Sequence, residues 1–308
     1  GILSSLGSAC ANVETNEYFY PLLYLYRRQV ADSGGPGRFR GGVSGSYSFA
    51  PYGTPNPLTC ALFSHGVEQP PSSGISGGYP GGTAQFALVR ESNLWKLFQS
   101  GKMPYDLEDL EGTMEIAPPK AVTQIGLNDV FRCVYPGGGG YGDPLDREPE
   151  LVVVDVQRGL VSEKAARDIY GILVDSGGRL ASAATERRRQ EIRAERQAHG
   201  SRASGTESHQ LIGECRPMGE YLELVGRGSQ AHVRCRRCGT IIAPGHENYK
   251  LHTPVGEYPL NRAGPQVAPN LDDGRFVLRE FYCPGCWTLL EVETNLKGEP
   301  FIWDVELA

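Results

Sequence analysis

The 308-residue sequence has no apolar run that approaches the roughly 18 residues of a membrane-spanning helix, and its first residues lack a signal-peptide pattern. It also lacks a basic excess, since 30 Lys and Arg stand against 36 Asp and Glu, a formal net charge of −6. An acidic balance of this kind is not typical of a general nucleic-acid binder. We therefore expect a protein that acts neither on membranes nor on nucleic acid.

Recognisable catalytic motifs are absent as well. The sequence contains no Gly-Lys-Ser/Thr phosphate loop, no evident catalytic triad and no pair of carboxylates at a telling spacing. A glycine run at 137–140 follows a predicted strand, and bare backbone amides there could cradle an anion. We favour the alternative that another backbone passes too close for any Cβ atom. Catalytic and cofactor-binding residues thus stay unknown.

The residues that are abundant indicate a folded, β-rich chain. Hydrophobic residues make up 40% of the sequence and there are 15 tyrosines, which is too many for a disordered protein. The 40 glycines and 22 prolines fit many turns between short strands.

Two Cys-x-x-Cys pairs organise the C-terminal part. Cys235 and Cys238 form the first pair, and after 44 intervening residues Cys283 and Cys286 form the second. Two such pairs can offer four thiolates to a tetrahedral Zn²⁺ ion, so we predict a closed, structural zinc ribbon with a long insert. Gly239 and Gly285 would supply the positive φ that such turns often need. Disulfides, or a redox Cys-x-x-Cys motif, are the alternatives.

Strand patterns fill the first half. They are predicted at 18–26, 43–49, 58–65, 84–90, 122–125 and 130–135, with Pro21 at a bulge or an edge. Strands at this spacing predict a sandwich or a barrel-like sheet. The tyrosine-rich segment around 18–26 is our candidate for a partner interface, because tyrosine suits surfaces with one buried and one wet side.

The middle of the chain changes character. Residues 151–156 are ambiguous between strand and helix, and a short helix is predicted after Ser162 as N-cap. Residues 185–196 are strongly helix-forming but almost without an apolar face, which predicts a solvated or subunit-bridging helix. The polar, Gly- and Ser-rich stretch that follows is typical of a linker.

The pattern beyond residue 211 is β again. Strands are predicted at 221–225, 231–234, 240–243, 276–282, 289–293 and 301–305, so that strands flank both cysteine pairs. His246 and His252 fall in the insert and are interpreted as loop residues, because four thiolates already complete a site. The remaining cysteines are scattered, which suits a reducing, cytoplasmic location.

The predicted fold class is α+β and mainly β. We expect a β-rich sheet domain with short helices at its C-terminal end over residues 1–175, a charged helical and flexible linker over 176–210, and a small all-β zinc-ribbon-like domain over 211–308.

The first half resembles the hydantoinase/oxoprolinase B-type subunits. The likeness runs through DSGGPGRFRGG at 32–42, YPGGGGYGDPL at 135–145, DVQRGLVS at 155–162 and AARDIYG at 165–171. It corresponds to the C-terminal part of such a subunit only. The glycines at 137–140 and Asp143 belong to this signature, with an undetermined role.

The second half resembles the small γ subunit of acetone-type carboxylases. The likeness rests on CRRCG at 235–239, HENYK at 246–250, CPGC at 283–286 and IWD at 302–304. Together the two resemblances imply a subunit of an ATP-dependent, biotin-independent ketone carboxylase of acetophenone or acetone type. They imply that ATP, with Mg²⁺ or Mn²⁺, binds to partner A-type subunits, that bicarbonate and a ketone are the substrates, and that Cys235, Cys238, Cys283 and Cys286 hold zinc.

This reading makes the chain a non-autonomous subunit that completes the fold of a larger B-type partner in a hetero-oligomer, and that is inactive alone. The sequence does not identify the substrate ketone or the stoichiometry of the complex. The first alternative is a subunit of an ATP-dependent hydantoinase- or oxoprolinase-type amidohydrolase. The second is a non-enzymatic zinc-ribbon interaction protein.

Overall fold

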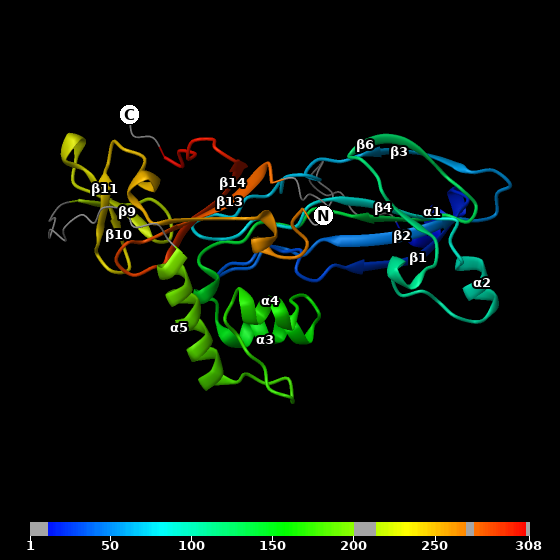
Figure 1. Ribbon diagram of the computed structural model, residues 1–308, viewed down its shortest axis with the longest axis horizontal. Coiled ribbons are helices and arrows are strands. Elements are labelled where there is room, and N and C mark those ends of the chain that lie inside the picture. Colours follow the sequence, from blue (N-terminus) through cyan, green and yellow to red (C-terminus); the bar gives the residue numbers. More distant parts are fainter. Residues whose placement is uncertain (1–11, 200–213, 269–273, 306–308) are drawn as a thin grey trace.

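A five-stranded antiparallel sheet forms one end of an elongated molecule (Figure 1). We describe it from a computed structural model, which covers residues 12–199, 214–268 and 274–305. The strands lie in the order β1 (Leu22–Gln29), β2 (Gly45–Pro51), β7 (Val130–Val134), β4 (Gln85–Arg90) and β5 (Thr113–Ile116).

Both faces of this sheet are covered. On one face lies a two-stranded ribbon of β3 (Leu58–Phe63) and β6 (Lys120–Ile125), with Phe49, Phe86 and Phe131 between the layers. On the other face, helix α2 (Leu94–Gln99) and the 3-10 turn η1 (Leu107–Asp109) pack over a second apolar cluster. This two-layered, mainly β arrangement confirms the predicted class.

The predicted strand that began at residue 18 is wrong in its first part. Residues Val13–Phe19 form helix α1, because the Asn12 side chain accepts the Glu14 amide proton and caps the helix. Strand β1 starts only after Pro21 and is an edge strand, as a proline at that point suggests. Strand β5 and helix α2 have no counterpart in the prediction.

Three helices follow the sheet. The ambiguous segment is helix α3 (Pro149–Gln157), with its proline in the first turn, and α4 (Glu163–Asp168) is capped by Ser162 as predicted. Helix α5 (Ser182–His199) is the longest in the described part of the chain. No helix in that part combines the length and the apolar character needed to cross a membrane.

Helix α5 is not a solvated helix. Thr185, Ile192 and Arg196 are 3–4% exposed, and Arg189 donates hydrogen bonds to the Tyr170 and Arg147 carbonyl oxygens at 3.2 and 2.6 Å. The inward face is polar and charged, so a search for apolar periodicity misses it.

The second half contains two further antiparallel sheets. One has the order β11-β10-β9-β8 and the other β12-β13-β14. Their strands are β8 (Cys215–Pro217), β9 (Leu222–Val225), β10 (His232–Cys235), β11 (Ile241–Pro244), β12 (Val255–Tyr258), β13 (Phe276–Tyr282) and β14 (Leu289–Leu296). Strands β8 and β12 were not predicted, and β12 belongs to the expected insert.

The strand predicted at 301–305 is wrong. This segment has no regular secondary structure. The buried Lys250 ammonium holds it, because it donates to the Ile302 carbonyl oxygen at 3.0 Å and to Asp304 at 2.6 Å. Tyr249 donates a further hydrogen bond to Asp304 at 2.5 Å. Tyr249, Lys250 and Asp304 thus join the two motifs HENYK and IWD.

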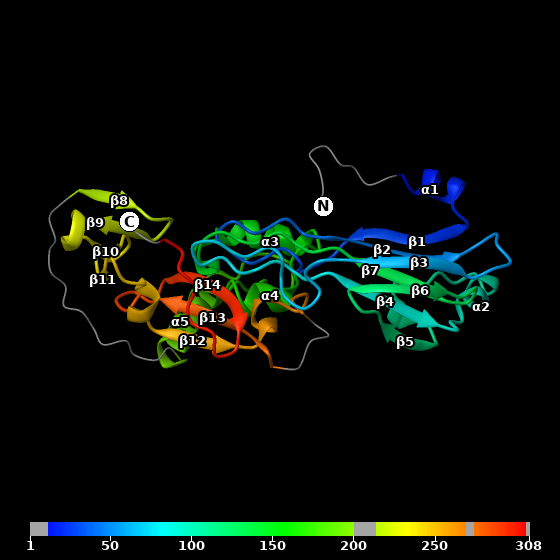
Figure 2. The same ribbon diagram turned by 90° about the horizontal axis from the view of Figure 1, so that it is seen from above.

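Glycine-rich segments connect the two ends of the molecule (Figures 1 and 2). Residues 33–42, 72–83 and 137–142 lie side by side and exchange backbone hydrogen bonds, among them Gly35 N to Gly138 O at 2.8 Å and Gly140 N to Tyr79 O at 2.9 Å. We call these three segments the glycine bundle. A Cβ atom on Gly137 would lie 1.7 Å from the Ser33 oxygen, and one on Gly139 would lie 1.9 Å from the Ser73 oxygen. The close-approach interpretation of the glycine run is therefore confirmed.

We expect Gly137→Ala to lower the free energy of unfolding by about 3 kcal/mol or more, because the added methyl meets backbone that cannot move aside alone. Gly42→Ala is the control, since a Cβ there meets nothing within 4 Å. Denaturant unfolding of the two variants checks the prediction. Equal stability of the two would show that the bundle is looser than described.

Candidate metal centre and the junction between the two halves

The four cysteines of the two Cys-x-x-Cys pairs meet at one point. Cys235 ends β10 and Cys238 lies in the turn to β11, while Cys283 and Cys286 lie in the turn between β13 and β14. One sulfur atom from each lies within 4.8 Å of the others, with Cys238 to Cys283 at 3.5 Å and Cys235 to Cys286 at 3.9 Å.

These separations fit a metal ion better than a disulfide. A disulfide bond is about 2.05 Å long. A tetrahedral ion with metal–sulfur bonds of about 2.3 Å instead sets neighbouring sulfur atoms about 3.8 Å apart. The cysteine cluster can therefore hold a metal ion. No other group of three or more possible ligands of this kind occurs in the described residues, and neither His246 nor His252 belongs to the cluster.

The two cysteine turns have the same hydrogen-bond pattern. Cys235 N donates to Thr240 O and Cys283 N donates to Thr288 O, both at 2.9 Å. The positive φ falls four residues after the first cysteine of each pair, on Gly239 at 77° and on Trp287 at 60°. The role predicted for Gly239 is confirmed. Gly285 instead provides space, because a Cβ there would lie 2.1 Å from Thr240 Oγ1.

The thiols influence one another strongly. In Cys286, hydrogen bonds from Cys235 and then Cys283 lower the pKa of the thiol far below its usual value. In Cys235, the hydrogen bond with Cys283 lowers the pKa, but the bond to Cys286 and burial outweigh it and raise the pKa to about 12. One thiolate is thus stabilised by its neighbours, and four thiolates in this space need a cation.

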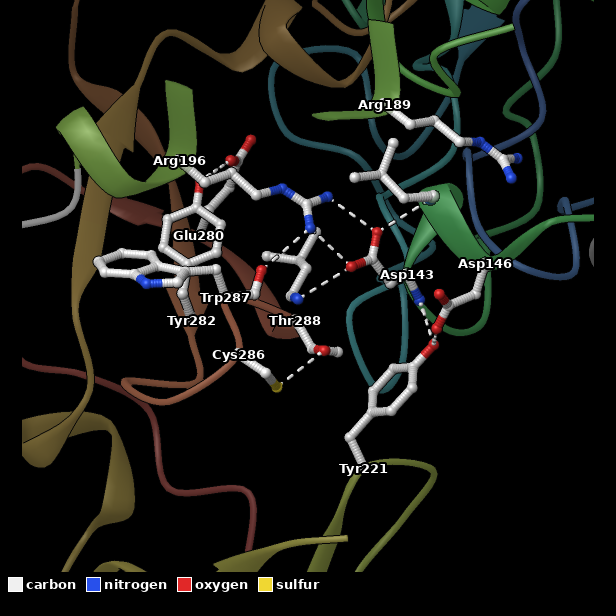
Figure 3. A network of polar contacts seen from close by, with 12 residues as sticks. Asp143, Asp146, Arg189, Arg196, Tyr221, Glu280, Tyr282, Cys286, Trp287 and Thr288 are labelled. Atoms are coloured by element: carbon white, nitrogen blue, oxygen red, sulfur yellow. Dashed lines mark hydrogen bonds and ion pairs between the residues drawn. The ribbon is translucent and has the colours of Figure 1, made fainter. Parts of the chain in front are cut away.

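A buried ion pair lies beside the cluster and joins the two halves of the chain (Figure 3). Asp143, directly after the glycine bundle, receives two hydrogen bonds from Arg196 of α5, at 2.6 and 2.8 Å. The same carboxylate accepts the Leu289 amide proton of β14 at 3.0 Å. Both side chains are 3% exposed or less. The pair therefore fixes the bundle, the helix and the second half at one point.

Further polar contacts lead from this pair to the cysteines. The Asp143 amide donates to the Tyr221 hydroxyl at 3.0 Å, and that hydroxyl donates to Asp146 at 2.8 Å. Arg237, inside the first cysteine turn, donates to Asp146 at 2.9 Å and to Thr288 Oγ1 at 3.3 Å. The position of the metal centre is thus tied to the first half of the chain (Figure 3).

The wider junction is also tight. The Tyr79 hydroxyl donates to the fully buried Glu280 of β13 at 2.6 Å, and the Ser76 amide donates to Glu291 of β14 at 3.1 Å. A Cβ on Gly77 would lie 2.2 Å from the Leu289 oxygen. The second half therefore packs directly on the glycine bundle.

Sequence reasoning named Asp143 without a role and missed Arg196. The signal was a helical stripe in which polar residues outnumber apolar ones. Its members recur at spacings of three and four and face inward: Thr185, Arg189, Ile192 and Arg196.

Comparison with known proteins gives two family matches. Residues 4–144 match the family model for hydantoinase B/oxoprolinase, and residues 215–308 match the one for the acetone carboxylase gamma subunit. The acetophenone carboxylase beta subunit of Aromatoleum aromaticum is 33% identical over 102 residues, which cover 29% of this chain and 70% of that subunit. This chain belongs to the family of acetone and acetophenone carboxylase subunits.

Longer relatives match a larger share of this carboxylase-family chain. The caprolactamase subunit beta of Pseudomonas jessenii is 35% identical over 58% of this chain, and the acetophenone carboxylase delta subunit of Aromatoleum aromaticum is 31% identical over 54%. The chain spans only 28% and 25% of these two relatives. A nucleotide-free acetone carboxylase structure superposes with a TM-score of 0.54 and 29% identity over 62% of this chain and 27% of that one.

We expect Cys286→Ser to lower the metal content of the purified protein to well below one ion per chain, because a closed site loses its charge balance and one ligand. Cys215→Ser, an exposed cysteine outside the cluster, should keep the metal. Elemental analysis of both variants by mass spectrometry is the measurement. Full metal content in Cys286→Ser would contradict the four-cysteine site.

We expect Asp143→Asn to cost about 3–5 kcal/mol of unfolding free energy at pH 7, because Arg196 would remain buried without its counter-charge. Asp168→Asn, in a surface pair with Lys164 at 2.7 Å, should cost much less. Chemical denaturation from pH 7 to pH 3 measures both variants.

The pH dependence of this cost follows from the pKa of Asp143. Burial alone would raise that pKa, but the charge and hydrogen bonds of Arg196, with two backbone amides, hold it below its usual value. The stabilisation is therefore complete above the unfolded-state pKa of about 3.9 and is lost as the pH falls below it. The gap between wild type and Asp143→Asn should shrink accordingly, and a constant gap would argue against this ion pair.

Proposed function

We propose that this chain is a non-autonomous subunit of an ATP-dependent, biotin-independent ketone carboxylase of acetophenone or acetone type. Its role is to complete the fold of a larger B-type partner and to assemble the complex through a structural zinc domain. The observation that carries this proposal is the union, in one chain, of a hydantoinase B-type part and an acetone carboxylase gamma-type part.

The contacts between the two parts support a permanent union. Asp143, Tyr79 and Ser76 of the first part each form a hydrogen bond with the β13–β14 hairpin region. Asp143 also forms a buried ion pair with Arg196 of α5. A flexible tether would not need such contacts. The gamma-type part is thereby held rigidly on the B-type part, as an assembly subunit requires.

Zinc is the metal we assign to the cysteine cluster. Four thiolates from two Cys-x-x-Cys turns suit Zn²⁺, and a site closed by four protein ligands leaves no position for a substrate. The domain division at 1–175, 176–210 and 211–308 also remains a proposal, with α5 as a packed connector between the two larger parts.

The partners are proposed from the parts of the longer relatives that have no counterpart in this chain. The longer relatives have about three quarters of their length outside the match, so we propose that a separate B-type subunit supplies the equivalent part and that an A-type subunit binds ATP with Mg²⁺ or Mn²⁺. Large apolar side chains lie exposed on α1 and on the β3–β6 ribbon, including Tyr18, Phe19, Phe63 and Val122 at 66–84% exposure. These surfaces are candidates for the contact with the partner. A cytoplasmic location is part of the proposal.

A second candidate is an ATP-dependent amidohydrolase subunit. The 35% identity to a caprolactamase subunit favours it. The gamma-type part favours the carboxylase, because that family model carries the name of a carboxylase subunit.

We expect purification of a tagged chain from its native cells to bring down large B-type and A-type subunits with one zinc ion per copy of this chain. The complex should hydrolyse ATP only when a ketone and bicarbonate are both present. Mass spectrometry of the subunits, metal analysis and an ATPase assay are the measurements, and the chain expressed alone should be much less soluble than the complex because its partner surfaces are exposed.

The other outcomes separate the candidates. ATP hydrolysis that depends on cyclic amides and not on bicarbonate would replace the carboxylase with the amidohydrolase. A soluble monomer without partners would refute the subunit role and favour a zinc-ribbon interaction protein.

A further inference from the structure

Each cysteine pair is followed two residues later by a threonine. Thr240 follows Cys238 and Thr288 follows Cys286, so the two cysteine turns share the pattern Cys-x-x-Cys-x-Thr. The carbonyl oxygen of each threonine accepts the amide proton of the first cysteine of its turn. The side-chain hydroxyl contacts the second cysteine: Thr240 Oγ1 lies 3.1 Å from Cys238 Sγ, and Thr288 Oγ1 lies 3.2 Å from Cys286 Sγ (Figure 3). Both turns therefore place a hydroxyl group on a candidate metal ligand.

The two hydroxyls reach the cysteines that the fold leaves accessible. Cys238 is exposed and Cys286 is partly exposed, whereas Cys235 and Cys283 are 0% exposed. An accessible thiolate ligand is open to water and to protons, which compete with the metal for the sulfur. A hydrogen bond to that sulfur offsets part of its charge and fixes its orientation. The threonines therefore lie on the two ligands for which such a bond matters most.

At Thr288 an arginine fixes the direction of the hydrogen bond. Arg237 Nη1 donates to the Thr288 oxygen at 3.3 Å, and because arginine has no acceptor atom, the hydroxyl proton of Thr288 is left for Cys286. A thiolate that binds a metal carries no proton and can only accept. Arg237 also donates to Asp146 at 2.9 Å. The contacts from Cys286 through Thr288 and Arg237 therefore end on a residue of the first half of the chain.

Each turn supports the threonine of the other turn. In the second turn, a Cβ atom on Gly285 would lie 2.1 Å from Thr240 Oγ1 and 3.1 Å from Cys238 Sγ, so the missing side chain makes room for the contact between these two atoms. In the opposite direction, Arg237 of the first turn holds the hydroxyl of Thr288, which is 3% exposed and thus shielded from water. The two threonine contacts therefore belong to one arrangement of both turns, and not to two independent ones.

We propose that Thr240 and Thr288 are positioning residues of the metal centre, which donate hydrogen bonds to the thiolate ligands Cys238 and Cys286, and that Arg237 strengthens the second of these bonds. A donor to the hydroxyl oxygen polarises the O–H group and strengthens the bond that this group donates in turn. Because the Arg237 side chain is paired with the first half of the chain, the affinity for the metal depends in part on that half. This inference rests on the zinc assignment of the proposed function, but on no activity of the complex.

The test measures the affinity for Zn²⁺ in competition with a chromogenic chelator, on the full-length chain purified together with any subunits that accompany it. Thr240→Val and Thr288→Val keep the branched shape and remove the hydroxyl. We expect each to weaken zinc binding by about tenfold, as the loss of an outer partner of a metal ligand does. Thr288→Ser keeps the hydroxyl and should restore most of the affinity. Thr294→Val is the control, because the Thr294 hydroxyl lies on the same strand but accepts from Gln69 at 3.3 Å.

A spectroscopic readout separates loss of the hydrogen bond from a general loss of packing. In the Co²⁺-substituted protein, the near-ultraviolet charge-transfer band reports the energy of the electrons on the ligand sulfur atoms. A hydrogen bond to sulfur lowers that energy, so its loss should move the band to longer wavelength. We expect this shift in Thr288→Val and in Thr240→Val, and a band close to that of the wild type in Thr288→Ser and Thr294→Val.

Two neighbouring arginines test the link to the first half of the chain. Arg237→Met removes the donor to Thr288 and should weaken zinc binding by about threefold or more. Arg236→Met removes the same charge from the same turn and should have a smaller effect, because Arg236 donates instead to the Gly219 and Glu220 carbonyl oxygens at 3.0 and 3.1 Å. Equal losses in the two variants would show a general effect of charge and would overturn the part assigned to Arg237.

The inference as a whole is overturned if both valine variants bind zinc as tightly as the wild type, if Thr288→Ser behaves like Thr288→Val, or if Thr294→Val loses as much affinity. Wild-type protein that binds neither Zn²⁺ nor Co²⁺ would overturn it together with the zinc assignment. A lack of ketone-dependent ATP turnover in a complex that retains its metal would bear on the carboxylase proposal alone.

Discussion

Close packing of bare backbone is the constraint on which the rest of this structure depends. In the glycine bundle, three segments approach so closely that a single methyl group on Gly137 or Gly139 would overlap a carbonyl oxygen of its neighbour. The hydrogen bonds of the bundle fix the orientation of the five-stranded sheet relative to β13 and β14. Without that approach, Asp143 would not reach Arg196 and the metal centre would lose its anchor on the first half.

Charge is used inside this protein to specify geometry. Asp143 with Arg196, Glu280 with Arg262, and Lys250 with Asp304 are pairs in which one or both partners are almost fully buried. Pairs of this kind add little net stability over well-packed apolar groups, but they tolerate only one arrangement of the segments that carry them. These pairs lie where segments distant in sequence meet. They therefore help to fix the arrangement of the two family parts at their junction.

The sequence predicted what depends on local pattern. Most strands of the sheet were found because β-branched and aromatic residues mark them, and the four cysteines were found because their spacing reflects ligand geometry. Helix α1 was missed because its aromatic residues are typical of strands while the cap at Asn12 decides the outcome. Arg196 was missed because its partner lies 53 residues away in sequence.

The order of the chain in the glycine bundle has a consequence for biosynthesis. Its three segments are separated by the ribbon and by most of the sheet strands, so the bundle cannot close until residue 142 has left the ribosome. Contacts at such separation in sequence form slowly, because the intervening chain must first be ordered. The partners of Asp143 are synthesised after it: Arg196 of α5 first and Leu289 of β14 later. The nascent chain therefore exposes the apolar strands of the first sheet until β7 has been made, which makes early binding of a partner or a chaperone an advantage during assembly.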